Sequence, residues 1–348
     1  MTEHDSTTNT ARLIGTANRG FAQHAQEEVR RLIPGVKFRT LVPTETFLAE
    51  APGSWEEISE AIRAQEPIFL RHMQPVQGER VLSGTDEDIL AAAELASELG
   101  GLHAGSSSAV QVRIADGTEV PYGASDVRAA CEIAMSEATG AETLVRHADK
   151  ILSVYVGQEA IYAGVSAPEE NLSDWSGGAI RFQREENQVS RAKFKLLEAE
   201  RKFHLHFADF RKAVDVGAAP GGWTSLLLER GLHVTAIDPA KMHPSLIKHP
   251  RLTYHGKNAS DVKLREGEFD LLVCDMSWSP RQMSRLILDL LPALQSGGTA
   301  IITAKLMHKK PFQTVKELKQ DFEGHLEMRQ AKQLFHNREE LTLYFVKK

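Results

Sequence analysis

Residues 214–224 read VDVGAAPGGWT, and this stretch decides the fold of the C-terminal half of the chain. An apolar strand runs into a glycine-rich turn, and the turn opens the helix GWTSLLLER of residues 222–230. Glycines let the backbone approach a ligand closely, and such turns lie at the carboxyl end of an α/β sheet, where these folds bind cofactors. The stretch therefore predicts a cofactor-binding loop, with a tight structural turn as the alternative.

The charges around this loop indicate which cofactor it binds. The spacing is not GxGxxG, and Asp215 stands at the end of the strand, where a carboxylate disfavours a pyrophosphate and favours a positively charged ligand such as S-adenosylmethionine. Asp238 ends the next strand, 21 positions after Gly217, where a carboxylate accepts hydrogen bonds from ribose hydroxyls. Asn258 follows the third strand and is expected to bond an adenine edge. The predicted cofactor contacts are Asp215, Gly217, Ala218, Ala219, Pro220, Gly221, Gly222, Trp223, Asp238, Asn258 and Asp275. On fold alone, a nicotinamide oxidoreductase is the main competing interpretation.

Residues 187–348 as a whole read as a doubly wound, Rossmann-like α/β domain with a seven-stranded sheet. Short and nearly continuous apolar strands are what a parallel sheet covered on both faces requires. The expected strands are residues 212–217, 233–238, 252–256, 269–276, 299–306, 325–334 and 341–348. The expected helices are residues 189–203, 222–230, 281–294 and 311–324.

Four charged residues of this domain stand where sites assemble. Counted at 100° per residue, Lys195 flanks the apolar stripe of its helix and can reach toward the sheet. Asp275 and Lys305 end strands at the carboxyl edge, and Glu340 opens the last strand. One charge at a strand end is usually only solvated, but four charges of alternating sign around one face are less easily dismissed as solvated.

The N-terminal half has a different charge and a different pattern. Within a net charge of −6, residues 1–180 carry a balance of −14 and residues 181–348 one of +8, so the C-terminal half is the better candidate for a polyanion partner. We expect a disordered tail over residues 1–10, an α+β ferredoxin-like subdomain over 11–76, a second α+β unit over 77–165 and a linker over 166–186. Ser54 and Glu57 form a predicted capping box, and KILSVYVGQEAIYAGVS, residues 150–166, reads as a hairpin. No catalytic constellation lies here, which indicates a binding or positioning module.

The composition excludes several classes of protein. Of 348 residues, 42% are hydrophobic and 25% charged, which argues against global disorder, collagen and coiled coil. There is no apolar run of 18 residues, and the polar start MTEHDSTTNT predicts no secretory signal. Two cysteines far apart fit a reducing cytoplasm, and the 14 histidines form no HxxxH or His/Cys cluster, so no metal is expected.

The motifs DVGAAPGGWT, SRAKFKL, the DM of DMSWSP and the Lys of TAKL resemble those of FtsJ-type RNA ribose 2′-O-methyltransferases, which use a Lys-Asp-Lys-Glu tetrad. The stretches NLSDWSGGAIRF and FHNREELTLYF are closer still to the RlmM family, which methylates cytidine ribose in large-subunit ribosomal RNA. The resemblance covers about residues 171–348. Members of that family carry an N-terminal THUMP RNA-binding domain, and the hairpin of residues 150–166 resembles its closing hairpin.

The resemblance implies a reaction and roles for the four charges. Lys195, Asp275, Lys305 and Glu340 become the tetrad, with Glu339 competing for the last place. Methyl transfer to a 2′-hydroxyl is an in-line displacement that depends on positioning, and Lys305 is the candidate general base. Lys195 would favour loss of the Lys305 proton, whereas Asp275 and Glu340 would orient Lys305 but oppose that loss. The alternative is an RNA-binding protein that keeps the cofactor pocket without catalysis.

Structured RNA, and ribosomal RNA in particular, is the expected partner, held at its phosphates and by its shape. The candidate contacts are Arg181, Arg184, Arg191, Lys193, His308, Lys309 and Lys310 near the catalytic face, with Arg128 and Arg146 in the N-terminal half. The target nucleotide and the oligomeric state do not follow from the sequence, nor does the loop in DMSWSP specify the substrate.

Overall fold

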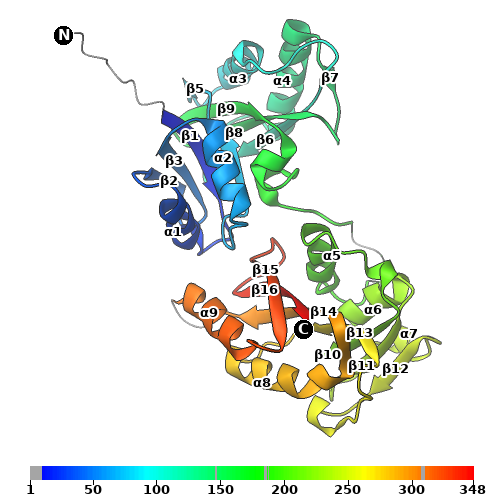
Figure 1. Ribbon diagram of the computed structural model, residues 1–348. Helices are drawn as coiled ribbons and strands as arrows, with labels where there is room; N and C mark the ends of the chain where they lie inside the picture. The colour runs from blue at the N-terminus through cyan, green and yellow to red at the C-terminus, as the bar shows by residue number, and fades with distance from the viewer. Residues whose placement is uncertain (1–9, 146, 184–185, 187, 307–309) are drawn as a thin grey trace. The chain divides into compact units, whose positions relative to one another are not determined.

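The computed structural model describes residues 10–145, 147–183, 186, 188–306 and 310–348. These residues form two compact units, the first ending at Ile180 and the second beginning at Arg181 (Figure 1). The first unit contains two sheets and the second unit contains one. The segment expected as a linker is thereby divided, because its residues up to Ile180 belong to the first unit.

The first unit begins with a four-stranded antiparallel sheet. Its strand order is β2-β3-β1-β4, with two helices in the connections. Helix α2 begins at the predicted capping box: the Ser54 side chain accepts from the Glu57 amide while the Glu57 carboxylate accepts from the Ser54 amide. The short strand β4, which the sequence did not predict, is buried at all four positions and therefore shows no alternation. The elements are β1 Thr10–Thr16, α1 Ala22–Leu32, β2 Lys37–Val42, β3 Thr46–Pro52, α2 Trp55–Ala64 and β4 His72–Pro75.

The first unit continues with a mixed five-stranded sheet of order β5-β9-β8-β6-β7. Strands β8 and β9 pair antiparallel from Ile151 opposite Ser166 to Val156 opposite Ile161, which confirms the predicted hairpin. Helices α3 and α4 pack on one face of this sheet, with Leu95 and Cys131 in their shared core. The elements are β5 Gly78–Val81, α3 Glu87–Glu98, β6 Ser107–Ile114, α4 Ala124–Thr139, β7 Glu142–Thr143, β8 Lys150–Val156 and β9 Ala160–Ser166.

The two sheets of the first unit share a core. Ile14 and Leu48 from the four-stranded sheet pack with Tyr155 and Tyr162 from the five-stranded one. The segment after β9, with short 3₁₀ turns at Pro168–Asn171 and Ser176–Gly178, is bonded to the same unit through Arg71 Nε, which donates to Gly177 O at 3.0 Å. This hydrogen bond holds the segment after β9 against the rest of the first unit.

The second unit is built on a seven-stranded sheet of order β12-β11-β10-β13-β14-β16-β15. The first five of these strands are parallel, whereas β16 runs antiparallel to both β14 and β15. The strands are β10 Lys212–Val216, β11 His233–Ile237, β12 Leu252–His255, β13 Phe269–Cys274, β14 Leu294–Lys305, β15 Leu326–Lys332 and β16 Glu340–Lys347. The helices are α5 Lys193–Lys202, α6 Gly222–Glu229, α7 Pro244–Ile247, α8 Pro280–Leu290 and α9 Pro311–Asp321.

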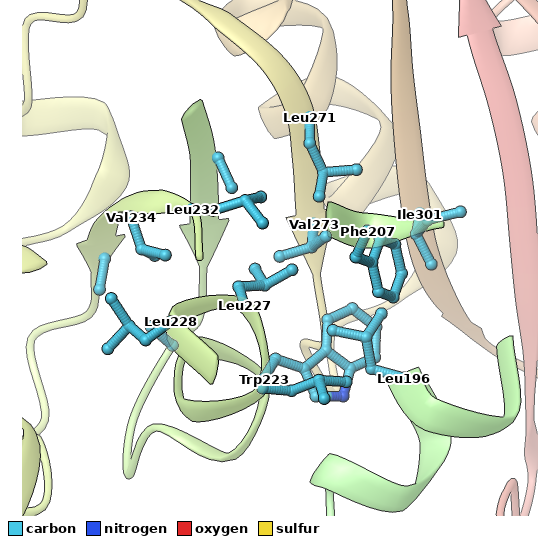
Figure 2. Close-up of a cluster of buried hydrophobic side chains, with 14 of the residues drawn as sticks. Leu196, Phe207, Trp223, Leu227, Leu228, Leu232, Val234, Leu271, Val273 and Ile301 are labelled. Atoms are coloured by element: carbon cyan, nitrogen blue, oxygen red, sulfur yellow. The ribbon is translucent and has the colours of Figure 1, made fainter. Parts of the chain in front are cut away.

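Helices α5 and α6 cover one face of this sheet. Leu196 from α5 and Leu227 from α6 meet Val273 and Ile301 from neighbouring strands in a buried cluster (Figure 2). The apolar stripe of α5 therefore faces the sheet, as its spacing predicts.

Helix α8 ends at Leu290, earlier than expected, and a 3₁₀ turn follows, because Pro292 has no N–H with which to continue the helix.

Across the described ranges, no helix is long and apolar enough to span a membrane.

Candidate active site

The glycine-rich turn between β10 and α6 has a backbone that only glycine adopts easily. Gly217 has a φ of +76° and Gly221 a φ of +113°. A Cβ at Gly217 would overlap Met276 Cγ, and a Cβ at Gly221 would overlap Leu246. The turn therefore requires glycine both for its backbone angles and for the close approach of its neighbours.

Asp238 fixes the far side of this turn. Its Oδ2 accepts from the amide of Ala219 at 3.0 Å, and its Oδ1 accepts from the amide of Ala240 at 2.7 Å. The amides of Gly217 and Ala218 donate to Ile237 O, the residue before Asp238. The predicted ribose-binding carboxylate is thus part of the same rigid turn as the predicted glycine loop.

Asp215 is buried at the end of β10 and bonded to the helix that the turn opens. Its side chain accepts from Thr224 Oγ1 at 2.6 Å, and the residue is 1% exposed. Burial, aided by the negative charges of Asp275 and Asp238, raises the pKa of Asp215 to about 7. Asp215 therefore ties strand β10 to helix α6.

Trp223 and Asn258, two further predicted cofactor contacts, also have partners within the protein. The indole of Trp223 lies in the core, where its Nε1 donates to Ala192 O at 2.9 Å (Figure 2). Asn258 is exposed, and its Nδ2 lies 3.4 Å from Asp261 Oδ2. The Trp223 ring thus serves the packing of α5 against α6.

Lys195 lies at the centre of the charged cluster. Its Nζ is 3.2 Å from both carboxylate oxygens of Asp275 and 2.5 Å from Glu340 Oε1. All three side chains are less than one-fifth exposed. Burial lowers the pKa of Lys195, but the two carboxylates outweigh it and raise the pKa above its ordinary value. Lys195 is therefore a fixed cation that holds two carboxylates together.

The direction of β16 brings Glu340 to this cluster. In a strand parallel to β14 the first residue would lie at the opposite edge of the sheet. Because β16 is antiparallel, its first residue Glu340 pairs with the last residue of β14, Lys305. The ion pair with Lys195 favours Glu340 over Glu339 for the last place, since both line the pocket but the ion pair to Lys195 is made by Glu340.

Lys305 stands apart from the ion pairs. Within the described ranges it makes no ion pair, it is exposed, and it lines an open pocket of about 370 Å³ with Ser277, Arg338, Glu339 and Glu340. The expectation that both carboxylates orient Lys305 is not what the structure shows, because Asp275 and Glu340 pair with Lys195. Lys305 shares the register position of Glu340 but keeps its amine toward the pocket.

The site contains residues that the sequence reasoning missed. Thr303 is 1% exposed, and its Oγ1 donates to Asp275 Oδ1 at 2.8 Å. Thr303 lies two positions before Lys305, so the period of two along a strand could have placed it on the same face. Glu198 lies three positions after Lys195, one turn along the same helix, and its contacts are described below.

The candidate RNA contacts differ in their availability. Arg181, Arg191 and Lys310 are exposed, whereas Lys193 is 4% exposed and paired with Glu229 at 2.8 Å, which removes it as a contact. Arg128 lies 3.8 Å from Glu132 on the same helix. The other candidates, Arg146, Arg184, His308 and Lys309, lie outside the described residues. In the part of the chain that is described, no three His, Cys, Asp or Glu residues gather to hold a metal ion.

An α/β sheet of this strand order, with a glycine turn after its first strand and a Lys-Asp-Lys-Glu group at its edge, has the architecture of a methyltransferase domain. Residues 188–333, within the second unit, match the FtsJ-like methyltransferase family. Its curated relatives are named Ribosomal RNA large subunit methyltransferase M. The relative from Halorhodospira halophila (strain DSM 244 / SL1) is 36% identical over 189 residues, 53% of this chain and 53% of its own.

A second relative of that name, from Psychromonas ingrahamii (strain DSM 17664 / CCUG 51855 / 37), is 34% identical over 209 residues, 55% of each chain. The chain thus spans about half the length of the curated relatives it matches. Among solved structures, TrmN from Thermus thermophilus is 16% identical with a TM-score of 0.44, over 97% of this chain and 100% of that one.

Proposed function

We propose that this protein is an S-adenosylmethionine-dependent RNA ribose 2′-O-methyltransferase that acts on large-subunit ribosomal RNA. The observation that carries the proposal is the cluster at the carboxyl edge of the sheet, where Lys195 pairs with Asp275 and Glu340 beside Lys305. The match of residues 188–333 to the FtsJ-like methyltransferase family supports the reaction, and the names of the relatives support the class of RNA. Because its proposed substrate is ribosomal RNA, we propose that the protein acts in the cytoplasm.

The residues around the glycine turn fit S-adenosylmethionine. The turn offers bare backbone at Gly217 and Gly221, where side chains would collide with the protein itself. Asp238 is fixed beside it by two amides and is the residue that would hold the ribose of the cofactor. The cofactor, when bound, supplies a methyl group on a sulfonium. Asp215, the backbone of Gly217–Trp223, Asn258 and Asp275 complete the proposed contacts.

The charged cluster accounts for the proton and the geometry. The attacking ribose hydroxyl must lose its proton as the methyl group is transferred, and Lys305 faces the pocket with an amine that accepts this proton once the amine itself is neutral. Lys195 holds Asp275 and Glu340 in fixed places, and Thr303 supports Asp275 through its hydroxyl. Positioning of the hydroxyl in line with the methyl group supplies much of the rate.

We further propose that the first unit positions the RNA. Its β-α-β-β-α-β order over residues 10–75 is that of ferredoxin-like folds, and we assign residues 77–165, with the hairpin β8–β9, to a THUMP-like domain. Among their described residues, neither contains a cluster like that of Lys195, which fits a binding role.

Ribose methylation in cells tests this function. Large-subunit ribosomal RNA from cells with and without the protein is mapped for 2′-O-methyl groups. We expect one nucleotide to lose its methyl group without the protein and to regain it with the wild-type chain but not with Asp275→Ala. Identical maps with and without the protein would contradict the proposal.

A further inference from the structure

Arg338 brings a second cation to the pocket of Lys305. It lies in the loop between β15 and β16, is exposed, and lines the pocket with Lys305. Its guanidinium makes no ion pair or hydrogen bond within the described ranges. The carboxylate of Glu339 lines the same pocket, and Glu340 is engaged by Lys195. The pocket therefore contains a guanidinium that no described residue of the chain engages.

The loop that carries Arg338 is held by a buried carboxylate. Glu198 is 7% exposed and accepts from the amides of Phe335 and His336 at 2.7 and 2.9 Å. A buried carboxylate is costly unless hydrogen bonds compensate it, and here both bonds fix one loop. Because Glu198 lies one helical turn from Lys195, the same helix positions the charged cluster and this loop.

Two further buried side chains fix the rest of the loop. Asn337 is 4% exposed, and its Oδ1 accepts from the amide of Leu334 at 2.8 Å and from Thr342 Oγ1 at 3.1 Å. Gln333 is fully buried, and its Nε2 donates to Arg338 O at 2.9 Å. The backbone on both sides of the Arg338 side chain is therefore fixed, so the chain presents this guanidinium from a rigid support.

We infer that Arg338 binds the phosphodiester on the 3′ side of the ribose that is methylated. In RNA the 2′-oxygen and the phosphate-bearing 3′-oxygen stand on adjacent carbons, so a hydroxyl at Lys305 brings that phosphate into the same pocket. A guanidinium binds a phosphate through two parallel N–H···O bonds, which orients the group as well as attracting it. This inference rests on the proposed function and adds how the hydroxyl is oriented.

Phosphate binding by Arg338 would distinguish an RNA strand from a free nucleoside as substrate. A chain that orients the ribose by its 3′-phosphate acts on an RNA strand rather than on a free nucleoside, which has no such phosphate. The bonds made by three buried polar side chains hold the loop in one place, so the exposed Arg338 is presented in one place.

The test compares Arg338→Gln and Arg338→Lys with the wild-type chain. The probe is unmodified large-subunit ribosomal RNA made by transcription, with methyl-labelled S-adenosylmethionine. For Arg338→Gln we expect the KM for RNA to rise about tenfold. We also expect the slope of log KM against log salt to fall by about 0.7 to 1. Arg338→Lys should recover part of the loss, since lysine keeps the charge without the paired bonds.

Arg329 supplies the matched control. It is an exposed arginine within β15, before the loop that carries Arg338, and it is already paired with Glu327 at 3.0 Å. Arg329→Gln should leave the KM and the salt slope unchanged, and all variants should bind S-adenosylmethionine as the wild type does. Wild-type methyl transfer with an unchanged KM and salt slope in Arg338→Gln would overturn the phosphate role alone. No transfer by the wild-type chain would overturn the proposed function and this inference with it.

Discussion

Lys195 and Lys305 occupy one site but face different surroundings. Lys195 is enclosed by two carboxylates that raise its pKa, so it stays charged and structural. Lys305 is exposed to the pocket and makes no ion pair within the described residues. The sequence placed both lysines at this edge, but which of them pairs with Asp275 depends on side-chain directions that spacing does not give. The same holds for Thr303, whose hydroxyl supports Asp275.

Substitutions of Lys305 distinguish a role as proton acceptor from a role as a positive charge alone. Lys305→Ala should lower the single-turnover rate on pre-bound RNA about 10²–10⁴-fold, with little change in RNA binding. Lys305→Arg should fail as well, because arginine stays protonated and cannot accept the hydroxyl proton. A near wild-type rate for Lys305→Arg would move the base role to another group and leave Lys305 as an electrostatic positioner.

Asp215 makes the stability of the second unit depend on pH. Its folded pKa of about 7 lies above the value near 3.9 of an unfolded aspartate, so the folded chain binds this proton more tightly. The stability from Asp215 is therefore complete at low pH and is lost as pH rises from about 4 to about 7. In thermal unfolding, the Tm of Asp215→Asn minus the Tm of the wild type should increase as the pH rises from 5 to 8. A constant difference in Tm across that range would contradict this pKa.

At the scale of elements, the reversal of β16 determines the site. Only seven residues, 333–339, connect β15 to β16, and a parallel pair needs a crossover of a dozen or more. The antiparallel direction was therefore implicit in the sequence. The position of β16 between β14 and β15 could not be predicted from the sequence, because local spacing carries no information on sheet order. The glycine turn and the hairpin β8–β9 were predictable because each is a local signal.

The glycine turn can be tested by separating backbone strain from a steric clash. Gly217→Ala should weaken S-adenosylmethionine binding about tenfold, because its Cβ meets Met276 at a φ of +76°. Gly324→Ala is the matched control, since Gly324 has a φ of +86° and nothing within 4 Å of a Cβ. It should lower the Tm through strain but leave calorimetric cofactor binding intact. Equal binding by all three proteins would remove the turn from the cofactor site.

At the scale of the whole molecule, the proposed function assigns catalysis to the second unit and RNA positioning to the first. The second unit has its own buried core and contains the entire charged cluster. Residues 181–348 alone should therefore bind S-adenosylmethionine like the full chain but methylate structured RNA at least about tenfold less efficiently. Calorimetry and initial rates at limiting RNA measure the two properties. A truncated chain that matched the full chain on the same RNA would show that the first unit does not position it.

Methyl transfer to a ribose hydroxyl of large-subunit ribosomal RNA, the proposed reaction, can be measured directly. The purified chain is incubated with unmodified transcript and methyl-labelled S-adenosylmethionine, and the RNA is digested to nucleosides. We expect label in a single 2′-O-methylnucleoside, present with the wild type and absent with Asp275→Ala. Label in a base-methylated nucleoside, or no label with the wild-type chain, would contradict the proposed reaction.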